Sequence, residues 1–282
     1  MTTESILLGT AQDAGVPQIG CDCPTCQRAR RDPARRHWVV CLALVDHSTG
    51  QSWLIDATPD IREQVDTLRK LVPDCPLSGI LLTHAHIGHY TGLLQVGPEA
   101  MNAQGLPIYA TAAMSNFLQH NLPWSQLVAW GHLKLQPLTL GEEFSLTPNL
   151  HVRPIRVPHR DEFSDTLAFV VRSPNQQLFY CPDIDAWDAW TYDLRTFVIG
   201  MTVALLDGSF FSAAELPGRD IRQIPHPLVT DTARRLKGVA CEVRFIHLNH
   251  SNPLLNSDSS EYAWLIAQGF DVGQLGQRWV MK

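Results

Sequence analysis

The stretch Leu81-Leu82-Thr83-His84-Ala85-His86-Ile87-Gly88-His89 places three histidines within six residues, directly after a short apolar run. The apolar residues from Ile80 to Leu82 predict a strand whose end presents the histidines in a tight loop. Imidazole is the most common ligand of zinc-like ions, so two or three of these rings can form one metal site. Three surface histidines are the alternative interpretation, and further ligand candidates downstream disfavour it.

Those further candidates stand where other predicted strands end. Leu178 to Cys181 precedes Asp183, Val203 to Leu206 precedes Asp207, and Val243 to Ile246 precedes His247. In α/β proteins, functional residues gather on the loops that follow strands, so side chains from distant parts of the chain can meet there. The sequence therefore predicts one site built from several strand ends.

The order of strands and helices predicts the fold class. Strands dominate the first two-thirds of the chain, and helices such as Asp60 to Val72, with apolar residues at helical spacing, separate them. Helices are also predicted at Asp231 to Leu236 and at Ser259 to Gln268. Without an internal repeat or a clear linker, residues 1–282 are expected to form a single α/β domain of two sheets with outer helices.

The histidine run resembles the His-x-His-x-Asp-His signature of the metallo-β-lactamase superfamily, and the resemblance extends over nearly the whole chain. Trp53 to Asp56 is similar to the strand whose final aspartate braces the histidine loop in that family. Val157 to His159, Tyr180 to Asp183 and Phe245 to His247 are similar to the segments that carry its later ligands. The resemblance implies an αββα sandwich of two mixed sheets with outer helices.

The resemblance also implies two groups of metal ligands. His84, His86 and His159 would hold one ion, and His89, Asp183 and His247 a second, with Asp183 between the two. One or two ions are expected, with zinc as the first choice and manganese or iron as alternatives.

One position departs from the family pattern. The family's aspartate, usually a ligand of the second ion, is replaced by Gly88, which has no side chain and cannot ligate. The second site would then bind its ion more weakly, unless another carboxylate compensates. Asp207, or Asp161 and Glu162 beside His159, are the candidates for that role.

A further metal site is predicted in the N-terminal part of the chain. Cys21, Cys23 and Cys26 supply three thiolates from one loop, and with a fourth ligand they would form a closed tetrahedral zinc site. The chain has seven cysteines, and this odd number fits a reducing compartment better than a disulfide framework. Free buried thiols are the alternative interpretation.

The run from Gly20 to Cys26 resembles two branches of the superfamily, the cyclic phosphodiesterase of phosphonate utilisation and the pyrroloquinoline-quinone biosynthesis protein B. The phosphodiesterase branch implies His250, three residues after His247, as the fourth ligand of a structural zinc. Ala57 to Arg62 and Ile224 to Pro227 are similar to the quinone branch, which the chain as a whole resembles most. That branch has lost much of the histidine signature that this chain keeps.

The leading hypothesis is a metal-dependent hydrolase. An ion held by His84, His86 and His159 would lower the pKa of bound water toward about 7, and the hydroxide would attack an anionic ester such as a phosphodiester. Asp183, His247 and His89 are the expected catalytic residues, which position the water, hold a second ion or transfer protons. The alternatives are a metal-dependent oxidoreductase like the quinone branch, and a non-catalytic binding module stabilised by its metals.

Composition limits the location and the partners. The 282 residues carry a net charge of −6, which argues against nucleic acid as the main partner. No apolar run approaches the ~20 residues of a membrane helix, and Met1 to Thr10 lacks the features of a signal peptide, so a cytoplasmic protein is expected. The expected partner is a small anionic substrate, and a homodimer is an open expectation.

Two weaker signals complete the prediction. The basic run from Arg28 to Arg36 is either a solvated helix face or a lip that attracts the anionic substrate. His226 is either a surface residue or an aid to proton transfer, and Asp207 either supports the site or forms a turn.

Overall fold

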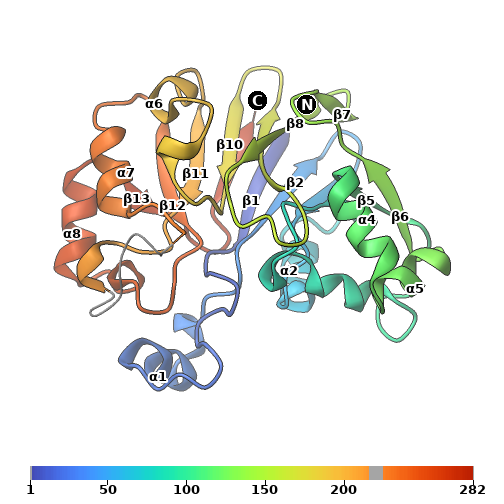
Figure 1. Cartoon of the computed structure of the whole chain (residues 1–282), viewed down its shortest axis with the longest axis horizontal. Helices are drawn as coiled ribbons and strands as arrows, with labels where there is room; N and C mark the ends of the chain where they lie inside the picture. The colour runs from blue at the N-terminus through green and yellow to red at the C-terminus, as the bar shows by residue number, and fades with distance from the viewer. Residues whose placement is uncertain (1, 216–224, 282) are drawn as a thin grey trace.

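The computed structural model describes residues 2–215 and 225–281, so Ile224 of the predicted Ile224 to Pro227 motif lies outside the described residues. Two seven-stranded sheets pack against each other, and helices cover their outer faces (Figure 1). This arrangement confirms the predicted αββα sandwich of two mixed sheets. No helix within the described ranges is both long enough and apolar enough to cross a membrane.

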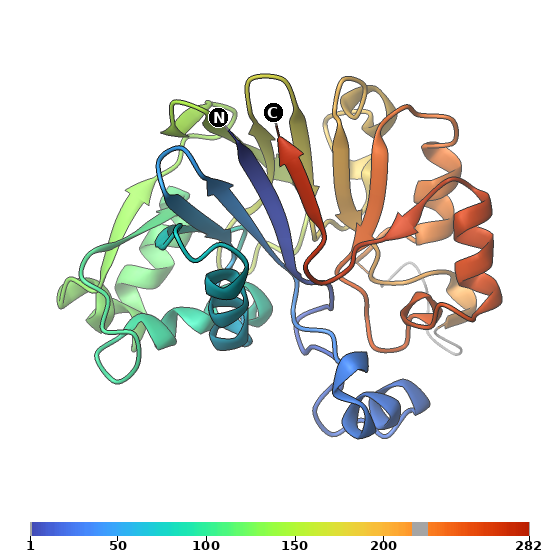
Figure 2. The same cartoon turned by 180° about the vertical axis from the view of Figure 1, so that it is seen from behind.

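The first sheet contains both ends of the described chain, since β14 pairs with β1 (Figure 2). Its strands, in spatial order, are β14 (Arg278–Met281), β1 (Thr3–Gly9), β2 (Cys41–Asp46), β3 (Gln51–Ile55), β4 (Leu77–Leu81), β5 (Leu106–Ala110) and β6 (Leu133–Pro137). The pairs from β14 to β3 are antiparallel, and those from β3 to β6 are parallel.

The second sheet is mixed in the same way. Its strands, in spatial order, are β13 (Asp271–Val272), β12 (Glu242–Ile246), β11 (Val203–Asp207), β10 (Gln177–Cys181), β9 (Thr166–Arg172), β8 (Leu150–Val157) and β7 (Phe144–Thr147). The pairs from β13 to β10 are parallel, and those from β10 to β7 are antiparallel.

Helices flank each sheet, and α1 (Pro24–Arg31) projects from one end of the molecule (Figure 1). The others are α2 (Ile61–Leu71), α3 (Ile87–Tyr90), α4 (Ala112–His120), α5 (Trp124–Ala129), α6 (Leu194–Phe197), α7 (Val229–Arg235) and α8 (Ser260–Ala267). The predicted limits of α2 and α8 are one residue too wide at each end, because the predicted end residues are the caps. Ser259, for example, accepts a hydrogen bond from the backbone N–H of Tyr262.

The central strands are apolar on both faces, as β2 illustrates. Leu42 and Leu44 point into the layer between the two sheets, whereas Cys41, Ala43 and Val45 point into the layer between the first sheet and its helices. Burying a leucine side chain stabilises the fold by roughly 1.5–3 kcal/mol. These rigid layers fix where the strands end, and therefore where the loops that follow them begin.

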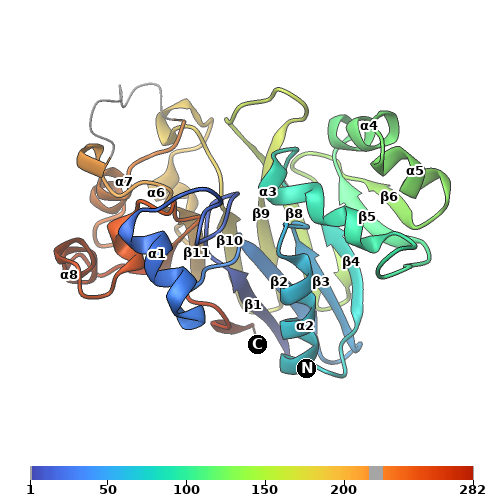
Figure 3. The ribbon, with the colours of Figure 1, turned by 90° about the horizontal axis from the view of Figure 1, so that it is seen from below.

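Polar residues follow the strand ends, as predicted. Asp56 follows β3, His84 lies just beyond β4, Asp183 just beyond β10, and His247 follows β12. Asp56 and His247 adopt positive φ angles of 74° and 62°, a conformation that costs energy in non-glycine residues and recurs at functional sites. Seen from the end that carries α1, the molecule shows α1 and α3 lying over these strand ends (Figure 3).

Candidate metal centre

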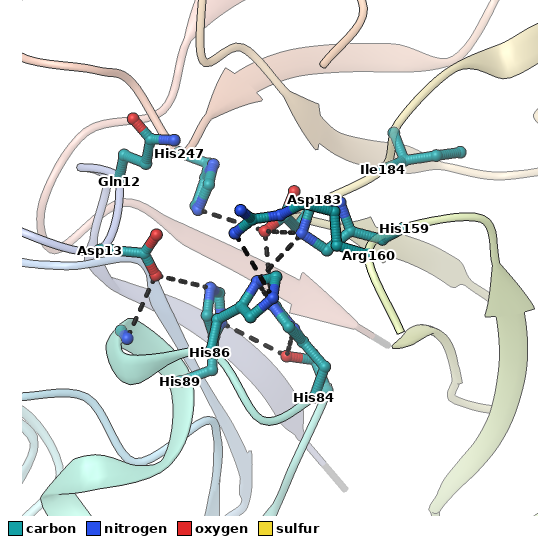
Figure 4. Close-up of polar contacts among 12 residues, drawn as sticks. Gln12, Asp13, His84, His86, His89, His159, Arg160, Asp183, Ile184 and His247 are labelled. Carbon is teal, nitrogen blue, oxygen red and sulfur yellow. Dashed lines mark hydrogen bonds and ion pairs between the residues drawn. The ribbon is translucent and has the colours of Figure 1, made fainter. Parts of the chain in front are cut away.

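Four ligand atoms from three separate segments converge at the predicted first site (Figure 4). His86 Nδ1 lies 3.0 Å from His84 Nε2 and 3.1 Å from His159 Nε2. Asp183 Oδ2 lies 3.1 Å from His159 Nε2 and 3.4 Å from His84 Nε2. The predicted first group therefore meets in space, and Asp183 joins it.

The spacing of these atoms fits a bound cation. Metal–nitrogen bonds of about 2.0–2.1 Å at tetrahedral angles separate neighbouring ligand atoms by about 3.3–3.4 Å. Lone pairs aimed at one point repel each other unless a cation or a shared proton lies between them, and burial strengthens the repulsion. The residues present thus fit a divalent metal ion.

Each histidine of the centre is held through its other ring nitrogen, which is how proteins orient metal-binding imidazoles. The pairs are His159 Nδ1 with Asp185 Oδ1 at 2.7 Å, His89 Nδ1 with Asp56 Oδ2 at 2.7 Å, His247 Nδ1 with Ser209 Oγ at 2.8 Å, His84 Nδ1 with Thr83 Oγ1 at 3.0 Å, and His86 Nε2 with Glu162 Oε2 at 3.1 Å. Asp185 and Ser209 were not anticipated from the sequence, although each lies two residues beyond an aspartate at a strand end.

Asp56 braces the histidine loop, as the family resemblance implies. Its buried carboxylate accepts hydrogen bonds from the backbone N–H and the hydroxyl of Thr83, at 2.8 and 2.9 Å, and from His89. Because asparagine tolerates a positive φ, Asp56→Asn leaves the backbone unstrained while removing the charge that orients His89.

We expect Asp56→Asn to weaken metal binding at His89 by about 10- to 100-fold, the range for loss of an outer-shell partner. A chromophoric chelator competing for the metal measures this affinity. Asp46→Asn is the matched control, because Asp46 is also buried and also accepts from a backbone N–H and from hydroxyl groups, but at the end of β2 and outside the metal clusters. Equal metal affinity in the two variants would contradict the bracing role.

The predicted second group is only partly assembled as expected. His247 Nε2 lies 3.8 Å from Asp183 Oδ2, in line with the prediction. His89 Nε2, however, points to Asp13 Oδ1 at 3.6 Å, and Asp13, His89 and His247 form a cluster of their own (Figure 4). Asp13 belongs to the loop after β1 and was missed in the sequence.

None of the three carboxylates expected to compensate for Gly88 joins the cluster of His89, although Asp207 forms a further group of potential ligands with Asp183, His226 and His247. Asp161 pairs with Arg156, Glu162 with His86, and Asp207 with His226.

Burial and neighbouring carboxylates shift the pKa values of the histidines in this centre in opposite directions. Burial disfavours the charged form of His89, but the carboxylates of Asp56, Asp13 and Asp183 outweigh it and raise the pKa of His89 to about 9. Burial likewise opposes ionisation of Asp183, but the neighbouring imidazoles, led by His247, hold its pKa well below the usual value. Burial lowers the pKa of His84, which leaves its ring neutral and able to ligate.

His226 is part of the centre and not a surface residue. Its side chain is 7% exposed, and its Nδ1 lies 2.8 Å from Asp207 Oδ2 and 3.3 Å from Asp183 Oδ1. Asp207 has both of the roles considered for it, since it supports His226 and also accepts from the backbone N–H of Ser209 in the turn.

The cysteine knuckle, Cys21 to Cys26, assembles with His250. The sulfurs of Cys21 and Cys23 each lie 3.5 Å from His250 Nδ1, and Cys26 completes the cluster. Zinc bonds of about 2.3 Å to sulfur and 2.0–2.1 Å to nitrogen place the two ligand atoms about 3.5 Å apart, so the geometry fits zinc.

The thiols of the knuckle cannot all ionise side by side. Burial raises the pKa of a thiol, yet at Cys23 the backbone N–H of Cys26 and the ring of His250 lower it to about 6. At Cys26, burial and the neighbouring cysteines raise the pKa to about 12. A bound divalent cation removes this conflict because it stabilises all three thiolates.

The basic run after the knuckle is partly solvated and partly structural, since Arg28, Arg31 and Arg35 are exposed. Arg30 donates to the backbone oxygens of Cys21 and Gln18, and Arg36 donates to that of Ala29. Arg160 places a positive charge beside the centre, with Nη2 3.5 Å from His86 Nε2 (Figure 4).

Comparisons with known proteins agree with the fold and with the family resemblance described above. The family model described as "Beta-lactamase superfamily domain" matches residues 52–250. Coenzyme PQQ synthesis protein B of Methylorubrum extorquens is 26% identical, over 96% of this chain and 97% of that protein. Its counterpart in Xanthomonas oryzae pv. oryzae is 28% identical over the same shares. The quinone-biosynthesis branch that the sequence resembles is thus represented among these relatives.

Among solved structures, Zn(2+)-bound PqqB from Methylobacterium extorquens superposes with a TM-score of 0.82 at 24% identity, covering 98% of this chain and 99% of that one. A diphosphatase from the PhnP family superposes with a TM-score of 0.73 at 21% identity, covering 99% and 97%. At these identities the superpositions show a shared fold.

Proposed function

The chain belongs to the β-lactamase superfamily, and from this membership we propose that it is a metal-dependent hydrolase of an anionic ester such as a phosphodiester. One observation carries the proposal: His84 Nε2, His86 Nδ1, His159 Nε2 and Asp183 Oδ2 converge with contacts of 3.0–3.4 Å. These four residues would hold the ion, for which zinc is the first candidate. A bound divalent ion supplies Lewis acidity, which lowers the pKa of water and polarises an ester oxygen.

The residues around the centre provide proton transfer. His226 is fixed by Asp207 through Nδ1, which leaves Nε2 facing the side chain of Gln12 at 3.4 Å. A ring held in this way can exchange a proton at Nε2 with an oxygen of the substrate. His89 and His247 would hold a second ion, and Asp183 lies between the two groups.

An anionic substrate is supported by the charge at the edge of the centre. The side chain of Arg160 is about half exposed and contacts His86 and Glu162, so a phosphate group can reach its guanidinium. The fold shared with a diphosphatase points to phosphorus esters, although the substrate named for that protein is its own.

The test is hydrolysis of bis(4-nitrophenyl) phosphate by protein stripped with a chelator and reloaded with zinc, manganese or iron. We expect turnover only after reloading, and faster turnover of this diester than of 4-nitrophenyl phosphate. Absence of ester hydrolysis with every metal, in protein that retains the ion at His84, would contradict the proposal.

The second candidate is a metal-dependent oxidoreductase. The observation that favours it is the similarity to coenzyme PQQ synthesis protein B along 96% of this chain. An oxygen electrode in the same reloading experiment separates the two, because oxygen uptake with iron and no ester cleavage supports this candidate. A non-catalytic module is disfavoured by His89 Nε2 and His247 Nε2, which are buried without a hydrogen-bond partner within the described part of the chain.

A further inference from the structure

Gly88 leaves a gap in the expected ligand set of the second ion, and the side chain of Asp13, from another segment, lies at that position. A β-carbon built on Gly88 would lie 2.2 Å from Asp13 Oδ1 and 2.6 Å from Asp13 Cα, distances too short for any side chain. Asp13 therefore occupies the space into which an aspartate at position 88 would extend. Its Oδ1 also accepts a hydrogen bond from the backbone N–H of Gly88 at 3.1 Å.

Asp13 faces two nitrogens that need a partner. Its Oδ1 lies 3.6 Å from His89 Nε2, and the ligand atoms of Asp13, His89 and His247 all lie within 4.8 Å of one another. His89 Nε2 and His247 Nε2 are fully buried, and neither has a hydrogen-bond partner among residues 2–215 and 225–281. A buried polar group without a partner destabilises the fold, so the site is built to receive one.

The loop that carries Asp13 is fixed from both sides. The backbone N–H of Gln12 donates to Leu248 at 3.0 Å, next to His247. Gly15, with φ of 67°, turns the chain and donates to Gln12 at 2.8 Å. Gly9 passes so close to Val39 that a β-carbon there would lie 1.9 Å from the carbonyl oxygen. These contacts hold Asp13 in a fixed position beside the histidine loop.

We propose that Asp13 is a ligand of a second divalent transition-metal ion, bound together with His89 and His247, and that it replaces the side chain missing at Gly88. Two imidazole nitrogens and one carboxylate oxygen form a donor set that suits zinc, manganese or iron. The inference rests on the proposed metal centre, but it concerns only the second ion.

The test compares Asp13→Asn with wild-type protein after equilibrium dialysis against zinc. Asparagine keeps the shape of the side chain and the acceptor for the Gly88 N–H, so it removes the charged ligand alone. We expect wild-type protein to bind two ions besides the knuckle zinc, and Asp13→Asn to bind one. The affinity of the lost ion should fall at least about 100-fold, beyond the range for an outer-shell change.

Two further variants separate ligation from loop positioning. Asp60→Asn is the matched control, because Asp60 accepts from the backbone N–H of Val39, the residue that pairs with Ala11 just before Asp13, and is not part of the histidine cluster; it should keep both ions. Asp13→Ala, which also loses the bond to Gly88, should bind no fewer ions than Asp13→Asn. Two ions retained in Asp13→Asn would overturn the role of Asp13 alone, whereas a wild-type protein with only the knuckle zinc would overturn the metal centre as well.

Discussion

His86→Ala is expected to release the ion held by His84, His159 and Asp183 and to abolish ester hydrolysis together with it. His86 Nδ1 lies 3.0 Å from His84 Nε2 and 3.1 Å from His159 Nε2, so the substitution removes the ligand atom that lies between these two. Removal of an outer-shell partner costs about 10- to 100-fold in affinity or activity, and removal of a ligand should cost more. We expect kcat/KM to fall by more than about 1000-fold, or ~4 kcal/mol of transition-state stabilisation.

The fold should survive this change. The His86 side chain is 11% exposed and lies in a loop, so truncation leaves the layers between sheets and helices untouched. Metal content by elemental analysis and hydrolysis of the diester are measured on the same sample. His120→Ala, at an exposed position at the end of α4, is the control that should keep both. Full metal content and turnover in His86→Ala would refute the assignment.

Cys23→Ser is expected to remove the knuckle zinc and to unfold the segment around α1. Structural zinc contributes ~10–16 kcal/mol of binding free energy in small zinc-finger peptides, and here the effect is confined to one projecting segment. The buried residues of α1 are Cys26, which belongs to the metal cluster, and Ala29. The helix therefore has little apolar packing that could hold it in place without the zinc. We expect a local loss of stability on the order of several kcal/mol, with the two sheets intact.

Limited trypsin digestion measures this loss directly. Arg28, Arg30, Arg31 and Arg35 lie within or just after α1, so a released knuckle should be cut there first. The zinc content should drop by one per chain while the ion at His84 remains. Cys241→Ser is the matched control, since Cys241 is a free thiol outside the metal clusters found among the described residues. If Cys23→Ser resisted trypsin as well as this control, the knuckle would not be what holds α1.

The parts of the molecule that were predictable from sequence are those encoded by local patterns. Apolar strands that end in Asp183 and His247 indicated where the ligands would meet, and the helical periodicity of α2 located it to within one residue at each end. The role of the histidine run as a metal-binding segment was predictable because three candidate ligands lie within one short loop. The knuckle was predictable for the same reason, with only His250 added from a distant segment.

Contacts between distant loops were not predictable. Asp13 and Gly88 are far apart in the sequence, and only the threading of the loop after β1 past Val39 brings them together. Gly88 signalled that a carboxylate was missing but not where its replacement would come from. The arginines after the knuckle raised a similar difficulty, because a basic run does not reveal that Arg30 will be used to bind backbone oxygens.

Side chains from distant segments are predicted to share one metal ion. Anomalous diffraction from a crystal of the purified protein, collected above the absorption edge of the metal that its fluorescence identifies, tests this most directly. We predict a peak about 2.0–2.2 Å from His84 Nε2, His86 Nδ1, His159 Nε2 and Asp183 Oδ2, in addition to a zinc peak at the cysteines. Anomalous density at the cysteines alone, in crystals grown with excess zinc, manganese and iron, would contradict the account.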